Sequence, residues 1–86
     1  MKVVFTDKFK QQFKRLPKHI QKKSNKQFLL LSQDFRHPSI RAKKVEGFSD
    51  VWEGRIDRFY RFVFTIEDEI INVIRIGPHD EALGKK

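Results

Sequence analysis

Apolar residues recur at helical spacing through the first forty positions of the chain. Residues 1–5 form a predicted short strand, and Thr6 with Asp7 then offers a helix cap. The first predicted helix ends before Pro17, and its apolar face carries Phe9, Phe13 and Leu16. A second helix is predicted from about residue 18 to 35, with one stripe formed by Ile20, Ser24, Phe28, Leu31 and Phe35. The link between the helices is very short, so we expect an antiparallel helical hairpin.

Beyond residue 40 the pattern changes to short runs rich in β-branched and aromatic residues, which are typical of strands. The predicted strands lie at 41–45, 51–56, 59–66 and 70–76, with short turns between the last three. We expect an α+β domain in which a short N-terminal strand and a helical hairpin pack on one face of a twisted, mainly antiparallel four-stranded sheet. The sequence shows no internal repeat and no linker, so residues 1–86 are predicted to form a single domain.

Composition excludes several classes of protein. The chain has no cysteine, which excludes disulfides and thiolate metal sites, and its three scattered histidines lack metal-ligand spacing, so no metal or other cofactor is expected. No apolar run approaches the roughly 20 residues of a membrane span, and the N-terminus lacks a signal-peptide pattern. We therefore expect a soluble cytoplasmic protein that makes no membrane contact.

The net charge of +8 is unevenly distributed. Residues 1–44 carry 13 basic and two acidic residues, whereas residues 45–86 carry six basic and nine acidic residues. A basic half of this size attracts nucleic acid or an acidic protein partner. The alternative is a lysine-coated helical surface kept for solubility, and composition leaves both interpretations open.

Four short motifs occur in a distinctive order after the helical half. They read Lys43-Lys44-Val45-Glu46-Gly47, Trp52-Glu53-Gly54-Arg55-Ile56, Tyr60-Arg61-Phe62-Val63-Phe64 and Ile74-Arg75-Ile76-Gly77-Pro78-His79-Asp80. In this order and spacing the chain resembles the RelE/ParE superfamily of toxins from type II toxin–antitoxin systems. Each motif is short and degenerate, so the resemblance rests on their order over nearly the whole chain. It implies a RelE-like fold and a cognate antitoxin as partner.

The resemblance implies one of two activities. RelE-type toxins cleave mRNA on the ribosome without a metal: the 2′-hydroxyl attacks the adjacent phosphate and leaves a cyclic phosphate and a free 5′-hydroxyl. Such chemistry needs cations around the phosphoryl group, a general base and a general acid. ParE-type relatives share the fold but inhibit DNA gyrase. A third possibility is an RNA- or ribosome-binding module that does not cut.

Two arginines are the predicted phosphate ligands. Arg61 lies in an otherwise apolar strand, where a charge is costly unless it reaches a functional surface or a partner. Strand alternation places it opposite the aromatic residues of that strand, hence on the open face if the aromatics meet the helices. By resemblance Arg61 matches the arginine that holds the scissile phosphate; the alternative is an ion pair with Glu53 or Asp57. Arg55 is expected on the same face, as a second phosphate ligand or in a surface charge pair.

His79 and Glu53 are the predicted acid and base. An imidazole with an ordinary pKa of about 6.5 exchanges protons at cellular pH, and by resemblance His79 occupies a catalytic position; otherwise it caps Asp80. Glu53 is interpreted either as the base for the 2′-hydroxyl or as the ion-pair partner of Arg61. Many family nucleases end in an aromatic residue that this chain lacks after Asp80. That departure favours gyrase inhibition, whereas His79 and the paired arginines favour the nuclease.

The remaining basic residues of the strand half are predicted to bind RNA. They are Lys43, Lys44, Arg58 and Arg75. The two lysines alternatively guard an exposed sheet edge against strand pairing, and Arg75 could point to either face. An antitoxin would be expected to lay a helix or strand across the open face and cover Arg55 and Arg61. Trp52 is predicted to pack toward the helices rather than to stack on bases.

Overall fold

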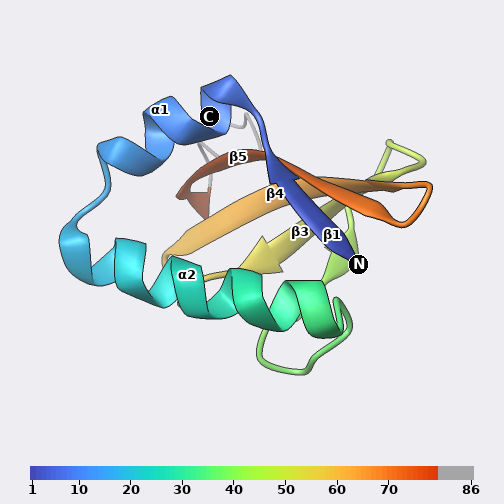
Figure 1. Cartoon of the computed structure of the whole chain (residues 1–86), viewed down its shortest axis with the longest axis horizontal. Coiled ribbons are helices and arrows are strands. Elements are labelled where there is room, and N and C mark those ends of the chain that lie inside the picture. Colours follow the sequence, from blue (N-terminus) through green and yellow to red (C-terminus); the bar gives the residue numbers. More distant parts are fainter. Residues whose placement is uncertain (80–86) are drawn as a thin grey trace.

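The computed structural model describes residues 1–79 and has two helices and five strands (Figure 1). Their order is β1 (Lys2–Phe5), α1 (Asp7–Lys14), α2 (Lys18–Gln33), β2 (Lys43–Lys44), β3 (Val51–Arg55), β4 (Tyr60–Glu67) and β5 (Ile70–Pro78). The strands form one sheet in the order β1-β5-β4-β3-β2. All neighbouring pairs are antiparallel except β1 and β5, which are parallel. The predicted α+β class is confirmed.

The sheet differs from the prediction in two details. It has five strands rather than four, because β1 pairs with β5 and points Val3 and Phe5 toward the same core as their partners Ile71 and Val73. The predicted strand at 41–45 is reduced to Lys43–Lys44. Arg41 has a φ of 51°, a left-handed conformation that cannot continue a strand.

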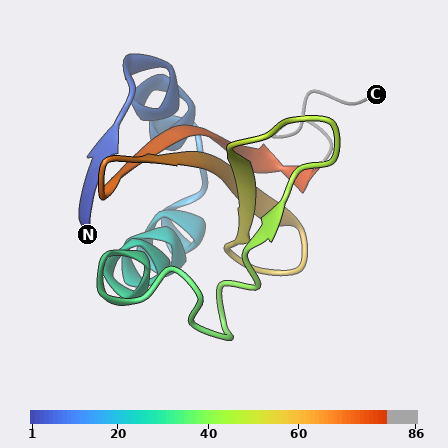
Figure 2. The ribbon, with the colours of Figure 1, turned by 90° about the vertical axis from the view of Figure 1, so that its right-hand side faces the viewer.

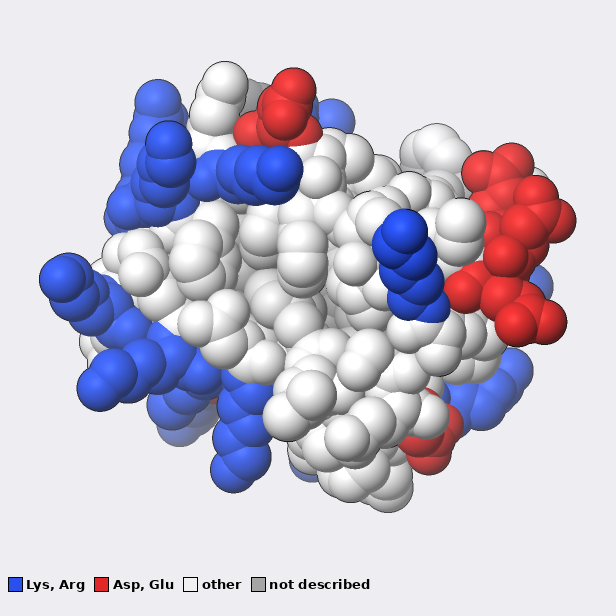
Figure 3. All heavy atoms as spheres, viewed as in Figure 1, with Lys and Arg blue, Asp and Glu red and all other residues white. Residues whose placement is uncertain are grey.

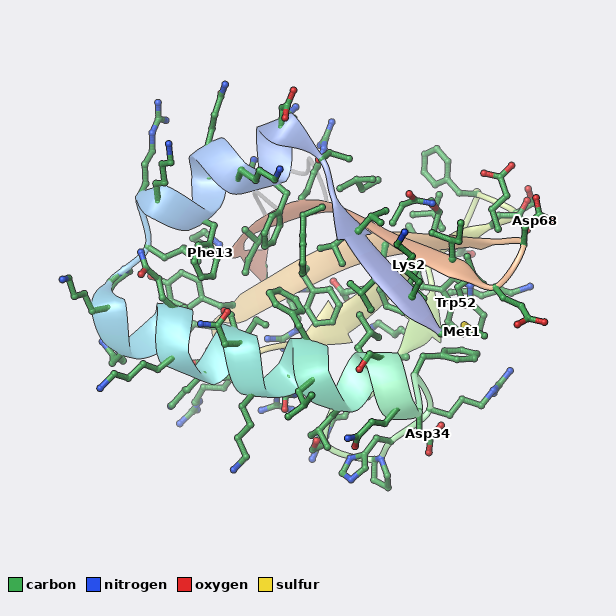
Figure 4. All side chains as sticks on the ribbon, in the orientation of Figure 1. Met1, Lys2, Phe13, Asp34, Trp52 and Asp68 are labelled. Carbon is green, nitrogen blue, oxygen red and sulfur yellow. The ribbon has the colours of Figure 1, made fainter. Side chains whose placement is uncertain are left out.

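Helix α2 lies against one face of the sheet, and α1 lies along the edge of β5 beyond the end of β1 (Figure 2). Both helices contribute residues to the same core. The side chain of Thr6 caps α1 by accepting a hydrogen bond from the backbone N–H of Phe9, as predicted. The helices run in opposite directions and diverge from their link (Figure 1). Phe13 lies between them (Figure 4). The side-chain amide of Gln21 donates to the carbonyl of Phe13, in the last turn of α1, and to the carbonyl of Leu16, in the link between the helices. Helix α2 ends at Gln33, two residues earlier than expected, because Asp34 is extended.

The core fills the space between the helices and one face of the sheet. Phe62 and Phe64 of β4 are completely buried there. The ring of Phe28, on α2, meets that of Phe62 edge to face with their centroids 5.1 Å apart. Trp52 is partly buried and stacks on Phe64, so its predicted core role is confirmed. The other face of β4 carries Arg61, Val63 and Thr65.

A β-bulge in β5 resets which residues face the core. Val63 pairs with Arg75 but Phe64 pairs with Val73, so Ile74 is an extra residue. As a result Val73 and Ile76 are both buried although they are three positions apart. The edge of β5 beyond β1 is covered by α1 and its cap: the Thr6 hydroxyl donates to the carbonyl of Ile74, and the side-chain oxygen of Gln12 accepts from the N–H of Ile76.

Gly54 lies directly against the ring of Phe62, its partner across the sheet. A Cβ added at Gly54 would come within 2.3 Å of the ring. We therefore expect Gly54→Ala to lower the free energy of unfolding by about 2 kcal/mol through overpacking. Urea unfolding followed by Trp52 fluorescence would measure this change. Phe62→Leu removes the clashing ring, so in a double-mutant cycle the double variant should lose less unfolding free energy than the two single variants lose together. Strictly additive losses would show that the two residues do not clash.

The β4–β5 turn carries backbone strain. Both of its central residues, Asp68 and Glu69, have positive φ, 51° and 63°, which matches a type I′ hairpin turn normally rich in asparagine and glycine. We expect Glu69→Gly to raise the unfolding free energy by about 1 kcal/mol, since a left-handed conformation costs an L-residue roughly that much. Thermal unfolding would show a higher Tm. Glu69→Gln is the control for charge repulsion in this acidic turn, and an equal gain from it would exclude the backbone explanation.

Candidate functional site

The open face of the sheet gathers charged residues from three strands and from the chain after β5. The register pairs Arg55 with Arg61, and Lys43 with Glu53. Directly opposite residues of antiparallel strands project to the same face. The N–H of His79 donates to the carbonyl of Phe59 at 2.8 Å, which brings His79 beside the start of β4. Residues far apart in the sequence therefore meet on one surface.

These residues line a hollow of about 240 Å³. Its walls are Arg41, Lys43, Glu53, Gly54, Arg55, Arg61 and His79. Among residues 1–79, four permanent cations thus surround one carboxylate, which suits the hollow to an anionic ligand. Four predicted catalytic residues, Arg61, His79, Arg55 and Glu53, are brought together here, with Lys43 of the predicted RNA-binding residues.

Arg61 lies on the open face, as strand alternation predicted, and is half-buried. Its Nη1 donates to the carbonyl oxygens of Asp57 and Tyr60. Within residues 1–79 neither Arg61 nor Arg55 forms an ion pair, so the alternative of a salt bridge to Glu53 or Asp57 is wrong. Like charges directly across a strand pair repel. An anion between the two guanidinium groups would relieve that repulsion.

Glu53 is almost completely buried, with 3% of its surface exposed. Its Oε1 lies 3.7 Å from Nζ of Lys43, and its Oε2 lies 3.4 Å from Nδ1 of His79. Neither Oε2 nor Nδ1 has a hydrogen-bond partner in the described part of the chain. The alternative in which Glu53 pairs with Arg61 is therefore replaced by contacts with Lys43 and His79. A carboxylate facing an imidazole in this way orients the ring and can exchange a proton through it.

Asp57 fixes the turn that carries Arg61. Its Oδ1 accepts hydrogen bonds from the N–H groups of Phe59 and Tyr60, both at 2.9 Å, and its Oδ2 lies 3.9 Å from Nζ of Lys23. Burial by itself would raise the pKa of Asp57, but the two backbone hydrogen bonds, with Lys23 and Arg61 nearby, hold that pKa below its ordinary value. Sequence reasoning considered Asp57 only as an ion-pair partner. Its role in the turn could have been recognised from the sequence, because an aspartate in a short link between strands commonly accepts a hydrogen bond from the N–H two residues later.

Three predicted RNA-binding residues lie outside the walls of the hollow. Nζ of Lys44 lies 5.7 Å from the ring centroid of Trp52, on the helix side of the sheet, because Lys44 alternates with Lys43. Arg75 pairs with Val63 and so shares the open face, beside the hollow rather than in it. Arg58 is exposed in the turn before β4.

Arg41 is a wall residue that the sequence did not indicate. The pattern assigned it to an edge strand, where it would have been one of several solvated charges. Arg41 instead has a left-handed backbone, with a φ of 51°, and lines the hollow. No periodicity in the sequence signals that conformation.

A second basic surface covers the helix layer, whereas acidic residues gather at the β4–β5 turn around Asp68 (Figures 3 and 4). The exposed basic residues of the helix layer are Lys8, Lys10, Lys14, Arg15, Lys18, Lys22, Lys23 and Lys26. They lie on the helices and the link between them, across the sheet from the hollow. In residues 1–79 neither helix has the length and apolar character needed to cross a bilayer.

Comparisons with known proteins agree with this architecture. The fold superposes on a YoeB/ParE toxin from Agrobacterium tumefaciens with a TM-score of 0.78 and 20% identity, covering 92% of this chain and 99% of that one. It superposes on the archaeal RelE of a RelE–RelB complex from Pyrococcus horikoshii with a TM-score of 0.77 and 19% identity, covering 94% and 97%. For the intact E. coli RelBE toxin–antitoxin complex the TM-score is 0.72 at 19% identity, covering 90% and 94%. No curated protein matches the sequence.

A family model provides the assignment that these distant structural likenesses do not. The model of the ParE toxin of type II toxin–antitoxin systems matches residues 3–83, nearly the whole chain. The resemblance noted from the motifs is thereby confirmed. The chain belongs to the ParE toxin family, within the RelE/ParE superfamily of toxins from type II toxin–antitoxin systems.

Proposed function

We propose that this toxin is a metal-independent endoribonuclease that cleaves messenger RNA on the ribosome and so inhibits translation. The observation that carries the proposal is the Glu53–His79 contact at the wall of a hollow that also holds Arg55 and Arg61. A proton-exchanging pair beside two guanidinium groups that form no ion pair within residues 1–79 supplies the components that transfer of an RNA phosphodiester needs.

Arg55 and Arg61 would hold the scissile phosphate. A guanidinium group binds a phosphate through two parallel hydrogen bonds. The contacts of Arg61 with two backbone carbonyls leave other N–H groups for the ligand and fix its orientation before RNA arrives. Charge that develops on the phosphoryl oxygens in the transition state would then meet the preorganised guanidinium of Arg61 and the second cation of Arg55.

Glu53 and His79 would move the protons. The Glu53 carboxylate takes the proton of the 2′-hydroxyl as the 2′-oxygen attacks the phosphorus. The bond from phosphorus to the 5′-oxygen breaks, and protonated His79 gives its proton to that oxygen. The products are a 2′,3′-cyclic phosphate and a free 5′-hydroxyl. His79 suits the outer role because its side chain is 44% exposed, whereas that of Glu53 is 4% exposed.

Lys43 and Arg41 at the wall of the hollow, with Arg75 and Arg58 around it, would guide the RNA backbone. A cognate antitoxin is the second partner of the proposal. The neighbouring toxins of known structure include RelE bound to RelB in Pyrococcus horikoshii and YoeB bound to YefM in Staphylococcus aureus. A segment laid across this cationic face would block Arg55 and Arg61 together.

Inhibition of DNA gyrase is the second candidate function, and the family model favours it, since the model describes ParE toxins. A gyrase inhibitor would need the basic surface for binding but would have no use for a buried Glu53 in contact with His79. The two candidates thus differ in whether the proton-exchanging pair matters.

We expect Arg61→Ala to slow mRNA cleavage by roughly 10²- to 10³-fold, as removal of one transition-state donor does elsewhere. Arg61→Lys, which keeps the charge but loses the fork, should recover only part of this loss. Purified variants would be assayed by primer extension on a reporter mRNA in a reconstituted translation system. Arg36→Ala is the matched control: Arg36 lies over the rings of Phe35 and Trp52, away from the hollow, and should leave cleavage unchanged.

A gyrase supercoiling assay on the same proteins would run in parallel. Intact mRNA together with inhibited supercoiling by the wild-type protein would replace the endoribonuclease proposal with gyrase inhibition. Intact mRNA and unaffected gyrase would leave only a binding role, and Arg61→Ala would then weaken ribosome binding without affecting any rate.

A further inference from the structure

Phe59 is the most exposed large hydrophobic side chain in the described part of the chain, with 65% of its surface accessible. It lies in the turn between β3 and β4, where polar residues are usual. Packing does not explain an aromatic ring at such a position, because the ring is largely in water.

The backbone of Phe59 lies beside a candidate catalytic residue. Tyr60 and Pro78 form the last pair of the β4–β5 ladder, and just beyond it the N–H of His79 donates to the carbonyl of Phe59 at 2.8 Å. His79 lines the hollow, and so does Arg61, two positions after Phe59. The exposed ring of Phe59 is therefore carried by backbone that adjoins the wall of the hollow.

Arg58 adds a cation to this ring. Its guanidinium carbon lies over the Phe59 ring, 5.4 Å from the centroid. Unpaired bases of single-stranded RNA stack on exposed aromatic rings and on arginine planes. An exposed ring with an arginine over it, on backbone that adjoins a cationic hollow, is suited to hold a base while the phosphate of that nucleotide is bound.

We propose that Phe59, together with Arg58, is a stacking platform for one base of the substrate, at a nucleotide that flanks the scissile phosphate. The proposal rests on the endoribonuclease function. Phe59 acts as a positioning residue: stacking fixes the nucleotide so that its phosphate stays between Arg55 and Arg61. Since every base has a π face, the platform tolerates different bases and fixes the cleavage position rather than the sequence.

The test measures the single-turnover cleavage rate of a short mRNA bound to ribosomes. The intact mRNA is compared with abasic versions, each of which lacks one base next to the cleavage position. With wild-type protein, one abasic version should be cut at least about tenfold more slowly, the order of magnitude of a base–aromatic stack. Phe59→Leu should cut the intact mRNA more slowly than the wild-type protein by the same factor. Its cleavage rate on that abasic version should be no lower than its rate on the intact mRNA. Phe59→Trp should restore both the rate and its dependence on the base.

Phe48→Leu is the matched control. Phe48 is 62% exposed, but it precedes Val51, whose partner Thr65 lies at the end of the sheet opposite to the Arg55–Arg61 pair. It should behave as wild type on every substrate. Because the Phe59 side chain packs on little, Phe59→Leu should also keep the wild-type Tm.

Two results would overturn the platform while leaving the nuclease intact. One is wild-type rates for Phe59→Leu on all substrates. The other is a Phe59→Leu variant that cuts the intact mRNA slowly and is slowed further on the abasic mRNA by the same factor as the wild-type protein. A merely structural role of Phe59 would make the effects of the substitution and of base removal additive in this way. If the wild-type protein cuts none of the mRNAs, the endoribonuclease function and the platform fail together.

Discussion

The contact between the ring of Phe62 and the backbone of Gly54 fixes the register of β3 against β4, and the site depends on that register. The ring occupies the place where a side chain at position 54 would be, so the two strands fit in one alignment. A slip by one residue would carry Arg61 into the core and Phe62 into water. Because Phe62 and Phe64 are held by the helices on one face, Arg55, Arg61 and Glu53 are held on the other.

The polar side of the site is stabilised by a local network that reaches back to the helices. Asp57 closes the β3–β4 turn through two backbone hydrogen bonds and links it to Lys23 of α2. Since the pKa of Asp57 is lower in the folded protein than its ordinary value, its contribution to stability is present at neutral pH and is lost as the pH falls through the folded pKa. The same turn presents its carbonyl to Arg61, so turn geometry and guanidinium position are coupled.

The sequence predicts features that follow from local patterns. The open-face position of Arg61 and the inward position of Trp52 follow from strand alternation, and the cap at Thr6 follows from a helix-start signal. Pairing over longer distances was less predictable. The bulge at Ile74 changes the phase of β5, so the face of Arg75 could not be inferred from a regular strand.

Other features of the site depend on backbone conformations that leave no periodic signal. The left-handed residue Arg41 is one example. Another is His79, whose N–H donates to the carbonyl of Phe59 and whose ring lies beside Glu53. The alternative interpretation of Arg61 as an ion-pair partner was wrong because the backbone carbonyls of its own turn, rather than a carboxylate, receive its N–H groups.

We propose that the hollow cuts RNA with a proton-exchanging Glu53–His79 pair and no metal. Mass spectrometry of the RNA ends made by wild-type protein and by Glu53→Gln on mRNA-programmed ribosomes would test this mechanism, and the cleavage rate would be measured again after trace metal is chelated from the toxin. We expect the wild-type protein to leave 2′,3′-cyclic phosphate and 5′-hydroxyl ends at a rate that chelation does not change, and Glu53→Gln to cleave roughly 10²- to 10⁴-fold more slowly. Ends with a 5′-phosphate, or full activity in Glu53→Gln, would rule the mechanism out.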